Sequence, residues 1–194
     1  KDDLISGGNP LDQTVYLGRD SGLNSTGTSN TFVGAEAGKV NTTGSDNSFI
    51  GAETAKNNTT GSYNTFVGSK TARSNTSGSL NTFIGYGSGD LNTFGDRNTF
   101  VGYVTGASNT TGACNTFVGY SSGNANTSGL KNTFIGNSTG LLNTTGYENV
   151  FIGNDAGRNN LTSYQNVFIG SCAGYYNVRG SLNTFLGHLS GVSN

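Results

Sequence analysis

The side chains that most often carry out catalysis or bind metals are few in this sequence, and they are scattered. His188 is the single histidine, and no cysteine or second histidine stands near it at a spacing typical of metal ligands. There is no glycine-rich phosphate-binding loop, and the acidic residues form no pair of the kind that glycoside hydrolases use; they include Glu36, Glu53, Asp90, Asp96, Glu148 and Asp155. We therefore expect no enzyme activity, no cofactor and no metal site.

Three tyrosines recur at an interval of 17 residues: Tyr86, Tyr103 and Tyr120. If each interval is one coil of a stacked structure, the rings form an exposed ladder with the ~4.8 Å spacing of neighbouring strands. Aromatic ladders on fibres can stack against sugar rings, so these tyrosines are candidate glycan-binding residues. The alternative is that each ring only covers the glycine corner beside it.

Three basic residues, Lys39, Lys56 and Arg73, recur at the same interval. Glu36 and Glu53 stand three residues before Lys39 and Lys56, a spacing that favours surface ion pairs. A patch that binds anionic glycans is the alternative.

The interval of 17 residues runs through nearly the whole chain. The consensus is N-T-F-V/I-G-x-x-A/S/T-G-x-x-N-T-T/S-G-x-x, preceded by a shorter coil that starts at Thr14; its coils begin at Asn30, Asn47, Asn64, Asn81, Asn98, Asn115, Asn132, Asn149, Asn166 and Asn183. No helical periodicity is present. The repeat predicts an all-β protein, a parallel β-solenoid (β-roll or β-helix) of about eleven coils over residues 14–194. Residues 1–13 are expected to be an N-terminal cap or the remnant of a preceding segment.

Glycine marks the corners of the predicted coil. The fifth, ninth and fifteenth positions hold 29 of the 32 glycines, which indicates corners that need positive φ or close backbone approach. Between the corners, Asn-Thr-Phe-Val is expected to form one strand and Asn-Thr-Thr a second. The asparagines of the first and twelfth positions are expected to form hydrogen-bonded ladders and turn contacts.

Two adjacent apolar columns predict partner chains. The third position is Phe, or Tyr16 in the first coil, and the fourth is Val, Ile or Leu. Neighbouring strand residues point to opposite faces, so Phe can fill the coil while the fourth column exposes an apolar stripe ~50 Å long. Such a stripe indicates an interface, and a homotrimer is the simplest solution. A twofold assembly, a monomer with a covering layer, and the reversed arrangement with Phe at the axis remain open.

Threonine columns at the second, thirteenth and fourteenth positions suggest ice binding as a different function, because regular threonines on flat β-solenoids can bind ice. Thr42 and Thr43 are neighbours, however, and on a strand they would face opposite ways. The columns are also interrupted by Phe94, Val150, Leu161, Val167, Val178 and Arg179.

Composition narrows the remaining classes. A net charge of −1 with 11% charged residues gives no basic footprint for nucleic acid, and no apolar run is long enough for direct membrane insertion. Cys114 and Cys172 would lie ~16 Å apart along the stack, beyond the ~7 Å limit for a disulfide. The start at Lys1 and the stop within a repeat at Asn194 suggest a processed chain or a fragment.

The repeat resembles a known type. Asn115-Thr-Phe-Val-Gly-Tyr-Ser-Ser-Gly followed by Asn126-Thr-Ser-Gly is similar to the arrays of bacterial and phage tail-fibre-domain proteins. More loosely, its architecture resembles the heads of trimeric autotransporter adhesins, whose coils are shorter. The resemblance covers roughly residues 14–194 and implies a trimeric fibre, often followed by a C-terminal chaperone domain that is not found in this sequence.

Together these features predict a structural or adhesive extracellular fibre segment, on a cell surface or as part of a virion tail fibre, that attaches to a surface or host. Its expected partners are copies of itself and host or cell-surface glycans. A passive spacer without recognition of its own and an ice-binding protein are the alternatives.

Overall fold

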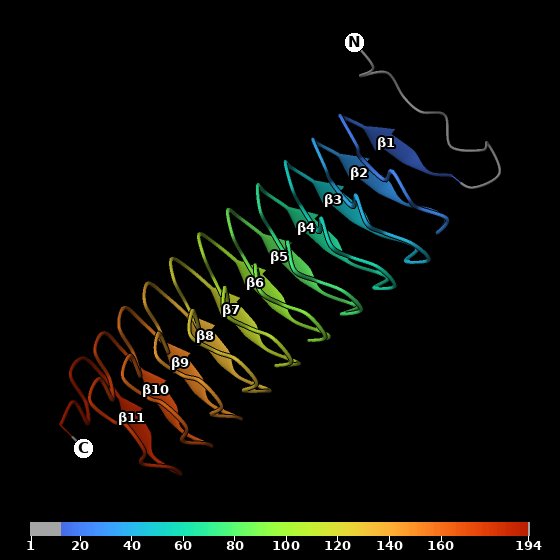
Figure 1. Cartoon of the computed structure of the whole chain (residues 1–194). Helices are drawn as coiled ribbons and strands as arrows, with labels where there is room; N and C mark the ends of the chain where they lie inside the picture. The colour runs from blue at the N-terminus through green and yellow to red at the C-terminus, as the bar shows by residue number, and fades with distance from the viewer. Residues whose placement is uncertain (1–12, 194) are drawn as a thin grey trace.

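A computed structural model describes residues 13–193, and its strands form a single long sheet. Figure 1 shows the strands following one another along one axis from β1 to β11, with the connecting segments looping back beside them. Each strand has three residues; they are β1 (Val15–Leu17), β2 (Thr31–Val33), β3 (Ser48–Ile50), β4 (Thr65–Val67), β5 (Thr82–Ile84), β6 (Thr99–Val101), β7 (Thr116–Val118), β8 (Thr133–Ile135), β9 (Val150–Ile152), β10 (Val167–Ile169) and β11 (Thr184–Leu186). Apart from Gln13, the predicted cap lies outside the described residues.

Every strand pairs in parallel with the strand of the next coil, in the order β1 to β11. The register places equivalent positions side by side, as where Phe32 pairs with Phe49 and Val33 with Ile50. The predicted parallel β-solenoid with a repeat of 17 residues is confirmed.

The core is a continuous column of phenylalanine rings. The nine from Phe32 to Phe168 are completely buried, and neighbouring rings stack with centroids 4.5–5.2 Å apart. Burial of each such side chain contributes roughly 1.5–3 kcal/mol. The phenylalanines therefore face inward, and the alternative with Phe at the axis of an assembly is wrong.

The two asparagine columns converge on the glycine of the fifteenth position. In one coil, Asn30 Nδ2 and Asn41 Nδ2 both donate to the carbonyl of Gly44, at 2.8 and 2.9 Å. In the next coil, Asn58 Nδ2 donates to Asn41 Oδ1 at 2.6 Å, and the backbone N–H of Asn47 donates to Asn30 Oδ1 at 3.0 Å. The predicted asparagine ladders are confirmed, and they satisfy buried polar groups in most coils.

This arrangement explains why the fifteenth position is glycine although its φ is not positive. A Cβ on Gly112 would lie 2.5 Å from the carbonyl oxygen of Gly129 in the next coil, where no side chain fits. The fifth and ninth positions instead require positive φ, as at Gly34 (136°) and Gly38 (56°). Positive φ therefore explains the glycines of the fifth and ninth positions, and close backbone approach explains the glycine of the fifteenth, as the sequence suggested.

One coil breaks this pattern, because Ser163 replaces the glycine. Its hydroxyl accepts a short hydrogen bond from Asn160 Nδ2, which no longer donates to Asn143. The buried oxygens Asn143 Oδ1 and Asn160 Oδ1 have no hydrogen-bond partner in the described chain. Asn177 Nδ2 likewise donates to the carbonyl of Gly180 and not to Asn160 Oδ1, so the ladder of the twelfth position is interrupted on both sides of Asn160.

The expected second strand is absent from the described part of the chain, and this prediction is wrong. The N–H groups of Thr42, Thr43 and Gly44 all donate to one carbonyl, that of Thr59, at 2.9, 3.1 and 3.2 Å. A parallel ladder needs a separate acceptor for each donor. Three donors that share one acceptor instead draw the chain into a bend.

The sequence also failed to reveal two corners built from variable residues. The seventh and seventeenth positions adopt the left-handed conformation with ordinary side chains, as in Glu36 (φ 59°) and Tyr63 (φ 59°). Each such residue costs on the order of 1–2 kcal/mol relative to glycine. The coil-to-coil hydrogen bonds of these residues, such as Glu36 N–H to the carbonyl of Arg19 at 2.8 Å, hold them there.

Candidate functional site

The outward face of the sheet is flat and carries no charged side chain. It consists of the first and third residues of the eleven strands, such as Thr99 and Val101, because the middle residue points inward. Ile50, Ile84 and Ile135 on this face are 42, 39 and 38% exposed. The predicted outward orientation of the Val/Ile column is confirmed, and threonine lies beside it in most coils.

The predicted tyrosine ladder forms on one edge of the rod. The Tyr86 and Tyr103 rings stack with centroids 5.4 Å apart and planes 14° from parallel. The Tyr103 and Tyr120 rings also stack with centroids 5.4 Å apart, and their planes are 5° from parallel.

Stacking restricts how the ladder could bind a ligand. Both faces of Tyr103 lie against neighbouring rings, so inside the ladder only ring edges and hydroxyl groups meet solvent. A sugar that stacks on an aromatic ring needs an open face. Such faces exist only at the two ends of the ladder.

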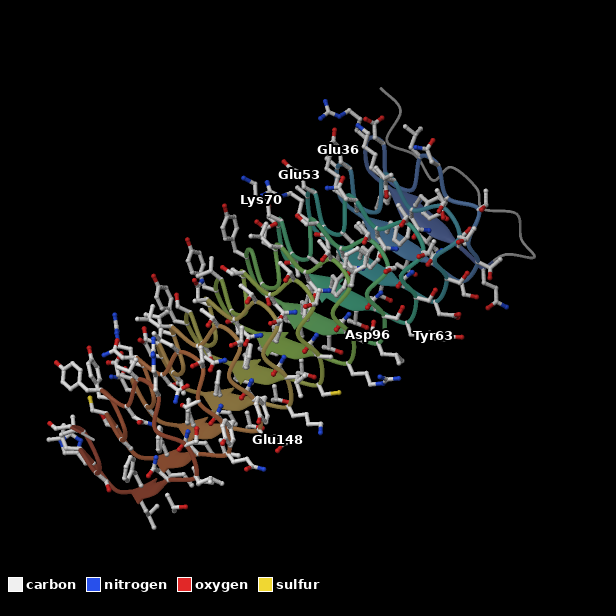
Figure 2. All side chains as sticks on the ribbon, turned by 60° about the horizontal axis from the view of Figure 1, so that its bottom comes forward. Glu36, Glu53, Tyr63, Lys70, Asp96 and Glu148 are labelled. Atoms are coloured by element: carbon white, nitrogen blue, oxygen red, sulfur yellow. The ribbon has the colours of Figure 1, made fainter. Side chains whose placement is uncertain are left out.

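Charged residues pair along the same edge, toward the N-terminus. Figure 2 shows Glu36, Glu53 and Lys70 in a row there, with Tyr63, Asp96 and Glu148 along the opposite edge. The basic column of Lys39, Lys56 and Arg73 lies beside the first row, three positions further along each coil.

The basic column pairs mainly between coils. Lys39 Nζ lies 3.0 Å from Glu36 Oε1, as predicted. Lys56, however, contacts Glu36 of the preceding coil at 2.6 Å rather than Glu53, and Glu53 lies 3.9 Å from Arg73. Hydrogen bonds from Lys56 and then Lys39 lower the pKa of Glu36 to about 2. Surface ion pairs are therefore present as expected, although Glu36–Lys39 is the only one of the two predicted partnerships that forms, and the basic column is partly neutralised.

A second aromatic pair lies at the sixteenth position and was missed from the sequence. The rings of Tyr147 and Tyr164 stack with centroids 5.0 Å apart and planes 6° from parallel. Beside them, Lys131 Nζ donates to Glu148 Oε1 at 3.1 Å, and Gln165 Nε2 donates to Glu148 Oε2 at 3.0 Å. The interval of 17 residues between the two tyrosines was the available signal.

The threonines of the thirteenth position form a regular column. Eight of them donate their hydroxyl to the carbonyl of the thirteenth residue in the next coil at 2.9–3.2 Å. Thr42 and Thr43 are both exposed and lie in a bend, so the alternation of faces expected for a strand does not apply to them. Phe94, 60% exposed, projects from the neighbouring column.

Other candidate chemistry is sparse in residues 13–193. Both cysteines are free, as expected from their separation, with Cys114 exposed. His188 is exposed in the last coil. In this part of the chain no three metal-ligating side chains of His, Cys, Asp or Glu come together, and no helix there has the length and apolar character to cross a membrane.

Comparison with known proteins gives no relative for this chain: no family model, curated protein or solved structure matches it significantly. The class that the structure defines is a β-solenoid repeat protein. Its function must be argued from its surfaces.

Proposed function

We propose that this chain is a rigid segment of an extracellular fibre that mediates attachment to a surface or host. The observation that carries the proposal is the uninterrupted column of buried rings from Phe32 to Phe168. Each coil contacts only its neighbours, as in other repeat proteins, and such stacks are extended and stiff. The resemblance to tail-fibre-domain repeats and adhesin heads agrees with this role on a cell surface or a virion tail.

The fibre is proposed to contain three chains that meet through the outward face of the sheet. This face is ~50 Å long and roughly 10 Å wide, so each chain would bury on the order of 500 Å². Around a threefold axis three such faces would bury on the order of 1,500 Å² in total, or about 500 Å² for each pair of chains, so the stability of the assembly would depend on all three contacts together. The absence of charge on the first and third strand residues means that no ionised group would have to be desolvated.

Sedimentation equilibrium tests this assembly. The wild-type chain is expected to sediment as a trimer, and Val101→Lys to shift it toward monomer because three ammonium groups would meet in the interface. Thr111→Lys, on an exposed position away from the sheet, is the matched control and should leave the trimer intact. A monomeric wild-type chain at micromolar concentration would rule out the interface.

Attachment is tested with beads coated with the rod. If the rod itself recognises a surface, coated beads adhere to host cells or glycan-coated surfaces above the level of beads coated with albumin. A passive spacer, the alternative, would show no adhesion, with recognition belonging to another part of the fibre.

Ice binding is a second candidate, favoured by the outward sheet face rather than by the thirteenth and fourteenth positions. The first strand residue is threonine in seven of the eleven strands, and the third is Val, Ile or Leu in all of them. The two columns lie side by side, and such a flat array of methyl and hydroxyl groups can order water. Thermal hysteresis of the wild-type chain, lost in Thr99→Tyr and kept in Thr110→Tyr, would support this function. A trimer without hysteresis would exclude it.

A further inference from the structure

The three tyrosines of the ladder are not equally exposed, and the difference locates an open ring face. Tyr86, Tyr103 and Tyr120 are 44, 49 and 54% exposed. Tyr103 has a stacked ring on each side, yet Tyr86, with only one, is less exposed than Tyr103. Other atoms of the chain therefore cover Tyr86 more than they cover Tyr120. Tyr120, the most exposed of the three and stacked on one side only, is the more open end of the ladder.

Beyond Tyr120 the edge becomes lower and polar. The equivalent position in the next coil is Asn137, which is exposed, and the one after that is Asn154. Because an asparagine is shorter than a tyrosine, the outer part of the Tyr120 ring extends past Asn137. The result is a ledge with an aromatic wall and an amide floor.

The amide of Asn137 is available to a ligand. Its side chain makes no hydrogen bond to another residue of 13–193, whereas Asn154 Nδ2 donates to Asp155 Oδ2 at 2.6 Å. An amide offers both donors and an acceptor, which suits the hydroxyl groups of a sugar. An aromatic face suits the C–H groups on the same ring, because its quadrupole is negative there.

Charge at the ledge indicates which sugars fit. From Thr116 to Leu130 and from Asn132 to Tyr147 there is no ionised side chain. The ion pairs of the same edge lie around Glu36 and Arg73 toward the N-terminus, and at Asp155–Arg158 one coil beyond Asn137. Arg158 is already paired with Asp155, so a neutral glycan can bind at the ledge without pairing a charge, whereas a carboxylated or sulfated glycan would find no unpaired counterion.

We propose that the outer face of Tyr120 and the amide of Asn137 form a subsite for one pyranose ring of a neutral glycan. This inference rests on the proposed attachment function and assigns its ligand class. Tyr103 then acts as a positioning residue, because its stacked ring holds the Tyr120 ring on edge with its outer face toward Asn137.

The test is a printed array of neutral and anionic oligosaccharides, probed with the wild-type chain in its native oligomeric state. A bound glycan is then titrated against four variants, all at exposed positions and each checked for an unchanged circular dichroism spectrum. Tyr120→Ala is expected to weaken binding by about tenfold or more, as truncation of a buried aromatic anchor does, and Asn137→Ala by less. Tyr120→Phe, which keeps the ring face, and Tyr86→Ala, at the less exposed end, should stay close to wild type.

Three results would overturn the inference: a bound glycan unaffected by Tyr120→Ala, selective binding of anionic glycans, or no binding to the array. The bead experiment separates this failure from failure of the proposed function. If wild-type beads adhere while the array is silent, the subsite is wrong and the attachment function stands. If neither binds, both are wrong.

Discussion

At the scale of single residues, the carbonyl oxygen of the fifteenth position connects both asparagine columns of a coil. Its carbonyl accepts from two buried asparagines, and its α-carbon leaves no room for a side chain. The sequence predicted both the glycine and the asparagines, but not that they form one unit. That link depends on residues 14 and 3 positions apart meeting inside the coil, which a pattern of residue types does not contain.

Ser163 provides a test of that unit. Ser163→Gly should allow Asn160 to donate to Asn143 Oδ1 and so satisfy a buried oxygen. Such an oxygen costs roughly 1–3 kcal/mol, and the added glycine costs about 0.5–1 kcal/mol of backbone entropy. We expect a net gain of about 1 kcal/mol, measured as a higher Tm and slower hydrogen exchange in the coil of Asn160. The reciprocal change Gly112→Ser should lower both, and equal Tm values for all three chains would contradict this account.

At the scale of elements, sequence reasoning predicted strands well and corners poorly. The strand predicted for Asn-Thr-Phe-Val was correct because the repeated phenylalanine, with a threonine on one side and a valine or isoleucine on the other, indicates one buried and one outward face. Asn-Thr-Thr has the composition of a strand, yet the N–H groups of its two threonines and of the following glycine share one acceptor, the carbonyl of Thr59. The left-handed corners were invisible because residues as different as Glu36 and Tyr63 are held there by neighbouring coils.

The candidate binding residues were also predicted only in part. The spacing of Tyr86, Tyr103 and Tyr120 was enough to predict a ladder, because equivalent positions of stacked coils must adjoin. It could not show that stacking closes the faces of Tyr103, since that depends on the ring orientation. The partners of the lysines were likewise only half predicted, because Lys56 reaches back to Glu36 rather than to the glutamate of its own coil.

At the scale of the whole molecule, the rod divides into surfaces with separate chemistry. The sheet face has no charge, and one edge carries the tyrosine ladder with ion pairs before and after it along the chain. The other edge carries Tyr147 and Tyr164. Figure 2 shows the two edges on opposite sides of the strands. Chains that meet through the sheet face would leave both edges exposed, so assembly and attachment can operate on the same rod without competing.

Because every coil contacts only its neighbours, whole coils should be removable. Deleting residues 81–131, three repeats of 17, joins Leu80 to Asn132 in frame and stacks Phe66 on Phe134. We expect a folded rod about 14 Å shorter by small-angle X-ray scattering, with the spectrum of the parent and a moderately lower Tm. The shortened rod also lacks Tyr86, Tyr103 and Tyr120, so it should assemble like the parent but lose binding to neutral glycans. Deleting residues 81–122 instead leaves a partial coil, and the two halves of the rod should then unfold separately. If the in-frame deletion unfolds as that one does, the rod is a single cooperative domain and not a stack of equivalent coils.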